Sequence, residues 1–125
     1  MKTRKIEIGI KPLKESLHEF ATVWDKLQRG EKVEKRSGIY FESIDAVRKV
    51  LTNKRLTVLK VIKEEEPNSV YALAKLLGRD LKNVNQDLKM LVDIGLVTVE
   101  PVKDDDKKRI VSHVEYDKIL LEIPV

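Results

Sequence analysis

The stretch SVYALAKLLGRDLKNVNQDLKMLVDIGLV, residues 69–97, contains the pattern that decides the fold. Ser69 is a residue type that commonly caps a helix, and apolar residues then recur at helical spacing as far as Leu77. Gly78 suits a left-handed C-cap, and Asp80 is a candidate N-cap for the next helix. Two helices joined by so short a turn cannot lie antiparallel, so the pattern predicts a helix-turn-helix.

A β-hairpin is predicted directly after this helix pair. Residues 96–99 alternate as a strand, a polar tip covers residues 103–108, and a second strand contains Ile110, Ser112 and Val114. Helix, turn, helix and hairpin is the order of a winged helix-turn-helix. The predicted fold class is therefore mainly α with a small β-hairpin wing, a winged helix-turn-helix with an N-terminal strand-helix extension.

Two more helices are predicted before Ser69. Ser43 is a candidate N-cap for a short helix that runs to Leu51, and Thr52 is a candidate N-cap for a helix that Pro67 stops. Upstream of them, Ile6, Ile8 and Ile10 alternate with other residues, as in a half-buried strand. We predict an extension over residues 1–42 and a winged helix-turn-helix domain over residues 43–125.

An amphipathic helix is predicted between that strand and Gly30. It begins at Pro12 or at Ser16, where Glu19 would complete a capping box. Its large apolar residues step by four and three and share one stripe: Leu13, Leu17, Phe20, Trp24 and Leu27. Two interpretations stay open, a cover for the domain's own core and the seam of a dimer. The alternating Ile6–Ile10 strand is a competing dimer contact, because an edge strand can pair with another chain.

Composition excludes several classes of protein. The chain has 125 residues, of which 42% are hydrophobic and 37% charged, which is enough for one core under a charged surface. It has no cysteine, so neither disulfides nor thiolate chemistry can occur. No apolar run approaches the length of a membrane span and no signal peptide is recognisable, so we expect a cytoplasmic protein. The net charge of +4 permits a polyanionic partner without requiring one.

Residues 69–97 resemble the winged helix-turn-helix of MarR-like and ArsR-like regulators, with Leu-Ala near the middle of the first helix, a glycine turn and a closing Gly-Leu-Val. Together with IYFESIDAVRKVLTNKRLTVLKVI and VEYDKILLEI, the chain resembles a family of small archaeal and bacterial transcriptional regulators over residues 6–123. The resemblance implies DNA binding. It also suggests an antitoxin-like role, in which a toxin would be the protein partner.

The second helix of the pair supplies the candidate base contacts. On a helical wheel its leucines and valines cluster on one side, while Lys82, Asn83 and Gln86 point away from them near its N-terminus, the part that meets base edges. Asparagine and glutamine can pair with adenine, whereas Lys89 and Arg79 suit phosphate or guanine. The alternative is that these are ordinary surface residues of a soluble helix.

Further candidates lie on either side of this helix. Ser69 and Tyr71 begin the preceding helix and could donate to a phosphate, although Ser69 is equally an N-cap. In the wing, three cations are candidates for contacts in the minor groove or with its flanking phosphates: Lys107, Lys108 and Arg109. Three neighbouring aspartates, residues 104–106, would repel phosphate, so a solvated turn without a DNA role is the alternative.

Catalysis has no support in the sequence. The two histidines, His18 and His113, do not have the spacing of metal ligands, and neither a phosphate-binding loop nor a nucleophile elbow occurs. We therefore predict no enzyme, no metal and no cofactor. The predicted function is sequence-specific binding of double-stranded DNA by a homodimeric transcriptional regulator. The alternative is a protein-interaction module whose N-terminal segment binds a partner.

Overall fold

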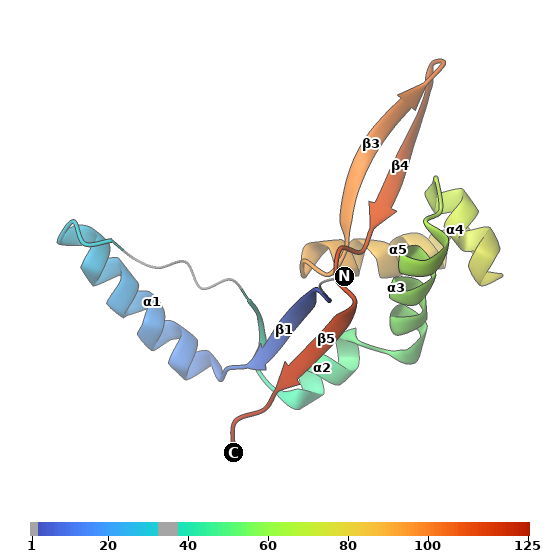
Figure 1. Ribbon diagram of the computed structural model, residues 1–125. Coiled ribbons are helices and arrows are strands. Elements are labelled where there is room, and N and C mark those ends of the chain that lie inside the picture. Colours follow the sequence, from blue (N-terminus) through green and yellow to red (C-terminus); the bar gives the residue numbers. More distant parts are fainter. Residues whose placement is uncertain (1–2, 33–37) are drawn as a thin grey trace.

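The computed structural model describes residues 3–32 and 38–125 (Figure 1). The helices within these residues are α1 (Leu13–Gln28), α2 (Ile44–Val50), α3 (Asn53–Glu65), α4 (Val70–Leu77) and α5 (Leu81–Asp93). The strands are β1 (Lys5–Ile10), β2 (Ile39–Phe41), β3 (Thr98–Asp104), β4 (Lys107–His113) and β5 (Lys118–Glu122). This order confirms the predicted fold class, a mainly helical winged helix-turn-helix with an N-terminal strand and helix.

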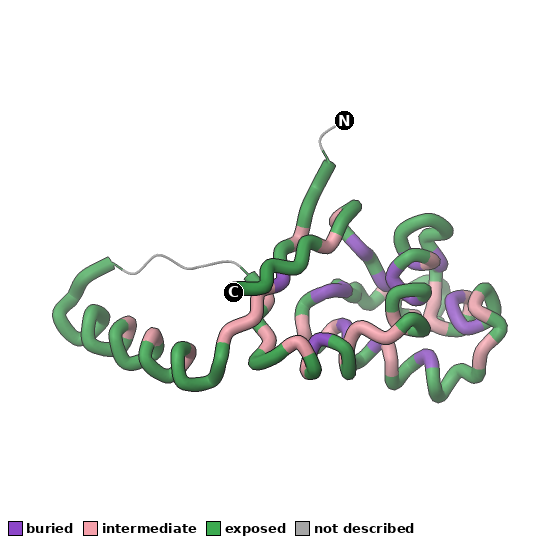
Figure 2. Tube along the Cα trace, turned by 90° about the horizontal axis from the view of Figure 1, so that it is seen from below, coloured by how far each residue is buried: buried purple, intermediate pink, exposed green. Residues whose placement is uncertain are grey.

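The core lies among α3, α4, α5 and the base of the wing. The largest side chains that are almost fully buried are Ile8, Val58, Ile62, Leu73, Val84, Leu91 and Leu96. Figure 2 shows most buried positions in the half of the chain that contains these helices. Ile8 is the contribution of β1 to this core, so the N-terminal strand is packed on the helical part of the protein.

Local capping chemistry agrees with the sequence at three helix starts. The hydroxyl groups of Ser43, Thr52 and Ser69 accept hydrogen bonds from the backbone N–H three residues later, at 3.2, 3.2 and 3.0 Å. Gly78 has φ of 63°, the left-handed conformation expected of the residue that ends α4. These contacts separate α3 from α2 and α5 from α4, which creates the helix-turn-helix.

Two predicted caps differ from the structure. Asp80 precedes α5, but among the described residues its side chain forms no capping hydrogen bond. The capping box at Ser16 is wrong, because α1 already begins at Leu13, directly after Pro12. Proline fixes φ near the helical value, so a helix can start beside it without a side-chain cap.

A three-stranded parallel sheet was not predicted from the sequence. Its order is β2-β1-β5, and Ile8 lies opposite Ile39 on one side and Leu121 on the other. Because β1 is the central strand, the prediction that Ile6–Ile10 offers a free edge to another chain is wrong. Figure 1 shows β1 and β5 side by side, although the two strands are separated by nearly the whole chain.

The entry into β5 is held by two polar contacts. The Tyr116 hydroxyl donates to the carbonyl oxygen of Leu96 at 2.9 Å, and burial raises the pKa of Tyr116 to about 12. The Asp117 carboxylate accepts from the backbone N–H of Arg4 at 3.0 Å and lies 3.4 Å from the ammonium of Lys63. These contacts, the backbone hydrogen bond foremost, lower the pKa of Asp117. They join β5 to β1, to α3 and to the turn after α5.

The wing is longer and its turn tighter than predicted. Strands β3 and β4 pair from Thr98 opposite His113 to Asp104 opposite Lys107, so most of the predicted polar tip is strand. Only Asp105 and Asp106 connect the strands, with φ of 44° and 69°. A two-residue turn with both φ values positive matches the twist of a hairpin, and aspartate tolerates this conformation. The hairpin itself was predicted, but the run of charges had concealed how far its two strands extend.

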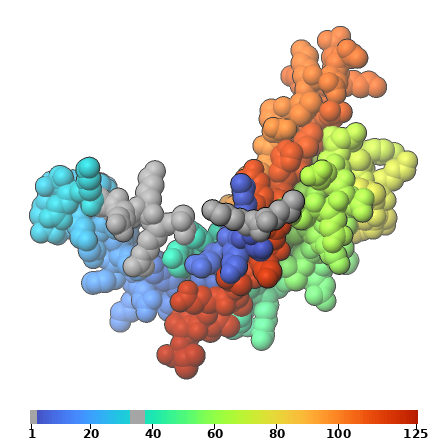
Figure 3. All heavy atoms as spheres, in the orientation of Figure 1, coloured from blue at the N-terminus to red at the C-terminus, as the bar shows by residue number. Residues whose placement is uncertain are grey.

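Helix α1 extends away from the rest of the chain, as Figures 1 and 3 show. Among the described residues, α1 contains none that is buried, and its apolar stripe is 55–66% exposed at every position. The interpretation that this stripe covers the domain's own core is therefore wrong. The base of the helix is tied to the sheet by an ion pair between Lys11 and Glu19. The Lys11 ammonium also lies 4.7 Å from the centre of the Tyr40 ring.

Candidate nucleic-acid interface

Helix α5 has one buried face and one exposed polar face. Val84, Leu88 and Leu91 are at most 5% exposed and anchor the helix to the core. The exposed polar side chains of α5 include Lys82, Asn83, Gln86 and Lys89, with Asn85 and Asp93 also exposed. The structure thus brings the predicted base-contacting residues together on one accessible surface, two of them cationic and two with amide groups.

The start of α4 contributes a hydroxyl and a phenol near the helix-turn-helix. The Ser69 oxygen accepts the capping hydrogen bond from Ala72, which leaves its proton available to a phosphate, so the two predicted roles are compatible. Tyr71 is 68% exposed. The proposed DNA contacts of both residues stay predictions.

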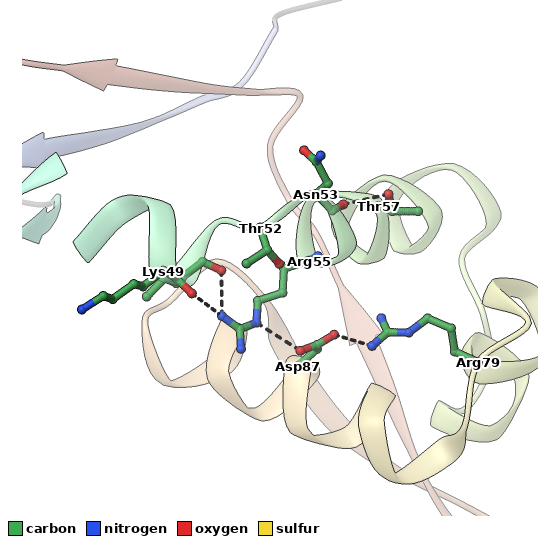
Figure 4. Close-up of polar contacts among 8 residues, drawn as sticks. Lys49, Thr52, Asn53, Arg55, Thr57, Arg79 and Asp87 are labelled. Atoms are coloured by element: carbon green, nitrogen blue, oxygen red, sulfur yellow. Dashed lines mark hydrogen bonds and ion pairs between the residues drawn. The ribbon is translucent and has the colours of Figure 1, made fainter. Parts of the chain in front are cut away.

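Arg79 has a different environment from the one that the sequence suggested. Its guanidinium donates to one oxygen of Asp87 at 2.8 Å, and Arg55 donates to the other oxygen at 3.1 Å (Figure 4). All three side chains are at least three-quarters buried. A phosphate contact of Arg79, which stays a prediction, would compete with this ion pair.

Sequence reasoning missed Arg55 and Asp87. They lie 32 positions apart in different helices, and the spacing of apolar residues carries no information about such a pair. Asn85 was missed as well: it is exposed on α5, beside the predicted contacts.

The wing offers fewer free cations than its sequence contains. The Arg109 guanidinium lies 2.8 Å from the Asp104 carboxylate, so much of its charge is neutralised within the hairpin. Lys107 and Lys108 are exposed near the tip. Any contribution of the wing to phosphate binding therefore falls mainly to these two lysines and to Lys103, which is exposed opposite Lys108, and it stays a prediction.

Comparison with known proteins assigns the chain to a family. The family model HVO_A0114 matches residues 50–121, more than half of the chain. The chain belongs to the HVO_A0114 family. The match begins at the end of α2 and extends into β5, so it includes the helix-turn-helix and the wing, whereas α1 and β1 precede it. No curated protein that was compared with this HVO_A0114 family member matches it.

Two solved structures are distantly similar to this member of the HVO_A0114 family. A possible transcriptional regulator from Methanosarcina mazei Go1 is 22% identical with a TM-score of 0.46, covering 59% of this chain and 66% of the other. NolR from Sinorhizobium fredii is 21% identical with a TM-score of 0.45, covering 86% of this chain and 83% of the other. This chain thus aligns with just under two thirds of the Methanosarcina protein.

Two other features, a metal site and a membrane-spanning helix, are absent from the described parts of the chain. There, no group of three or more histidine, aspartate or glutamate side chains is placed to hold a metal ion. Every helix within the same residues is too short or too polar to cross a membrane.

Proposed function

We propose that this protein is a sequence-specific double-stranded DNA-binding transcriptional regulator, not an enzyme, that acts in the cytoplasm as a homodimer. The observation that carries the proposal is the exposed polar face of α5, which lies opposite a buried apolar face in the second helix of a helix-turn-helix. Such helices enter the major groove with their N-terminal residues against the base edges.

In this arrangement some side chains of α5 would contact bases and others would contact the phosphate backbone. Asn83 and Gln86 would each place an amide against adenine, where both the N6 donor and the N7 acceptor can be paired. Lys82 would contact guanine or phosphate, and Lys89 would bind the backbone and fix the register. Ser69, Tyr71 and the wing lysines would add phosphate contacts that strengthen binding without specifying sequence.

The test is a fluorescence-anisotropy titration against the chain's own upstream promoter DNA and a scrambled duplex of equal length, each at two salt concentrations. Wild-type protein should prefer the promoter, and the preference should persist at the higher salt concentration. The double variant Asn83→Ala/Gln86→Ala should reduce the ratio of the two affinities by about tenfold or more, since each good amide pair contributes ~1–3 kcal/mol of discrimination. Asn53→Ala, an exposed asparagine on α3, is the matched control. Equal binding of both duplexes by the wild type would refute specific readout.

Lysine 89 allows a second, contrasting measurement. Lys89→Ala should weaken binding to both duplexes alike and lower the slope of log K against log salt by about one, because one phosphate contact is lost. A change in sequence preference would show that Lys89 contacts a base instead.

The apolar stripe of α1 supports the homodimer. Its five large side chains are 55–66% exposed in the single chain. Each side chain therefore leaves about 100 Å² of accessible surface, and the five together leave roughly 500 Å² per copy that association could bury. Two such stripes would bury about 1,000 Å², near the lower limit for a specific interface. A two-fold dimer would also place two copies of α5 on half-sites about one turn of DNA apart.

The same stripe favours the alternative function, a protein-interaction module. Phe20 and Trp24 stack with their ring centres 6.2 Å apart and form an aromatic surface of the kind that anchors protein interfaces. In an antitoxin-like protein, this surface would bind a toxin. A monomer at high concentration, together with an adjacent gene whose product binds α1, would favour this function over the homodimer.

A further inference from the structure

Three charged side chains form a continuous connection across the helix-turn-helix (Figure 4). Asp87 of α5 lies at its centre, with one carboxylate oxygen 2.8 Å from Arg79 and the other 3.1 Å from Arg55. The side chains are 13%, 22% and 19% exposed, respectively, so solvent screens these ion pairs only weakly. We call these three residues the Asp87 clamp.

One end of the Asp87 clamp is hydrogen-bonded to the backbone at the α2–α3 junction, and the other end lies in the turn of the helix-turn-helix. The Arg55 guanidinium also donates to the carbonyl oxygens of Lys49 and Val50, at 2.8 and 3.0 Å, where α2 ends. Arg79 lies in the short connection between α4 and α5. The clamp therefore joins α5 to the α2–α3 junction and to the turn that leads into α5 itself.

The position of Asp87 on α5 relates the clamp to the exposed polar face. Asp87 lies three residues after Val84, directly before Leu88 and four residues before Leu91. It is therefore at the border of the buried stripe. It also lies four residues after Asn83, so these two side chains are neighbours on the helix surface. Apolar packing is non-directional, whereas two charge-assisted hydrogen bonds to one carboxylate resist rotation of the helix about its axis.

We propose that Asp87 is a positioning residue for DNA readout: held by Arg55 and Arg79, it fixes the rotation of α5 and so the direction in which Asn83 and Gln86 point. The inference rests on the proposed function. It gives Asp87 no contact with DNA, and it explains why an acidic residue lies on a helix that would face a polyanion. The charge of Asp87 is neutralised by two arginines before DNA arrives.

The test compares Asp87→Asn with Asp93→Asn in the full chain. Both changes remove one negative charge from α5, but Asp93 is exposed and forms no ion pair within the described residues. Two quantities are measured for each protein: the ratio of its affinities for promoter and scrambled duplexes, and the hydrogen-exchange rates of the α5 amides in the free protein. Arg79→Lys, which keeps the charge but lacks the forked donor, is a second variant in case Asp87→Asn does not fold.

For Asp87→Asn, the affinity ratio is expected to fall by about tenfold, the effect of one mismatched base pair, and the amides of α5 should exchange faster than in the wild type. Asp93→Asn should change neither quantity, although it strengthens binding to both duplexes through its charge. Arg79→Lys should show the Asp87→Asn effects in weaker form.

The proposal is overturned if Asp87→Asn, or Arg79→Lys where only that variant folds, matches Asp93→Asn in both quantities. Equal binding of both duplexes by the wild type would instead refute the proposed function. The exchange rates would then decide by themselves whether the Asp87 clamp orients α5.

Discussion

Replacing Leu17 with alanine should weaken self-association of this protein by about thirtyfold while leaving the stability of the single chain unchanged. Leu17 is in the middle part of the α1 stripe and is 59% exposed. It therefore contributes little to the core of its own chain, and its apolar surface is available to a second copy.

The magnitude follows from that exposed fraction. Complete burial of a leucine stabilises by about 1.5–3 kcal/mol, and the 59% still exposed leaves roughly 1–2 kcal/mol to be gained on association. Alanine keeps about a third of this, so the loss is ~1 kcal/mol per copy and ~2 kcal/mol for a two-fold dimer. Since 1.4 kcal/mol is a factor of ten, the dimer Kd should rise about thirtyfold.

Sedimentation velocity over a range of concentrations measures this Kd, and the fluorescence of Trp24, the single tryptophan of the chain, gives a second signal. Trp24 is 55% exposed, so its emission should shift to the blue as the protein concentration rises and the dimer forms. Leu76→Ala is the matched control, because Leu76 is similarly exposed (53%) but lies on α4. Unfolding by urea at a concentration where the chain is monomeric should give equal free energies for Leu17→Ala and wild type.

A dimer contact through α1 is refuted if Leu17→Ala and Leu76→Ala have the same dimer Kd, or if the wild type stays monomeric at the highest concentration. The first result would place the contact on another surface, and the second would leave α1 to a different protein.

Two further predictions concern the attachment of β5. Because the backbone N–H of Arg4 and the ammonium of Lys63 lower the pKa of Asp117, its contribution to stability is complete above the ordinary carboxyl pKa and is lost as the pH falls through the lowered value. Asp117→Asn should therefore reduce the fall of the urea unfolding midpoint as the pH is lowered. An unchanged pH dependence of this midpoint in the acid range would contradict the prediction. Burial raises the pKa of Tyr116 from 10.0 to about 12, so the wild type should lose stability relative to Tyr116→Phe across that interval. Below pH 10 the variant should instead be about 1 kcal/mol less stable, because the hydrogen bond to Leu96 is gone; equal midpoints there would refute its contribution.

The helix-turn-helix could be predicted because its determinants are local. The caps at Ser43, Thr52 and Ser69 act over three residues, and Gly78 ends α4 through its own backbone conformation. The exposed face of α5 follows from helical periodicity for the same reason. A pattern that is repeated every few residues can be interpreted without knowledge of the rest of the chain.

The parallel sheet and the Asp87 clamp could not be predicted in this way. Ile8 pairs with Leu121, and Arg55 with Asp87, across long separations in the sequence. An alternation of apolar and other residues indicates a strand but not which strands pair with it. In the same way, a charged residue at the edge of a helix's apolar face does not indicate its ion-pair partner. In the wing, the cluster of charges suggested a longer loop. The polarity of Asp105 and Asp106 did not indicate that both can adopt positive φ and so form a two-residue turn.

The two interpretations of the α1 stripe show where periodicity stops being informative. Spacing of four and three specifies that one face of a helix is apolar, and it is the same whether that face meets its own core or another chain. The structure separates the cases because the core is already closed by α3, α4, α5 and Ile8, while Phe20 remains 66% exposed. An exposed apolar stripe of this size is costly to leave in water, which supports the proposal that a partner outside the chain covers it. A second copy would cover the stripe with the same residues on both sides, and it would supply the second α5 that a palindromic site needs.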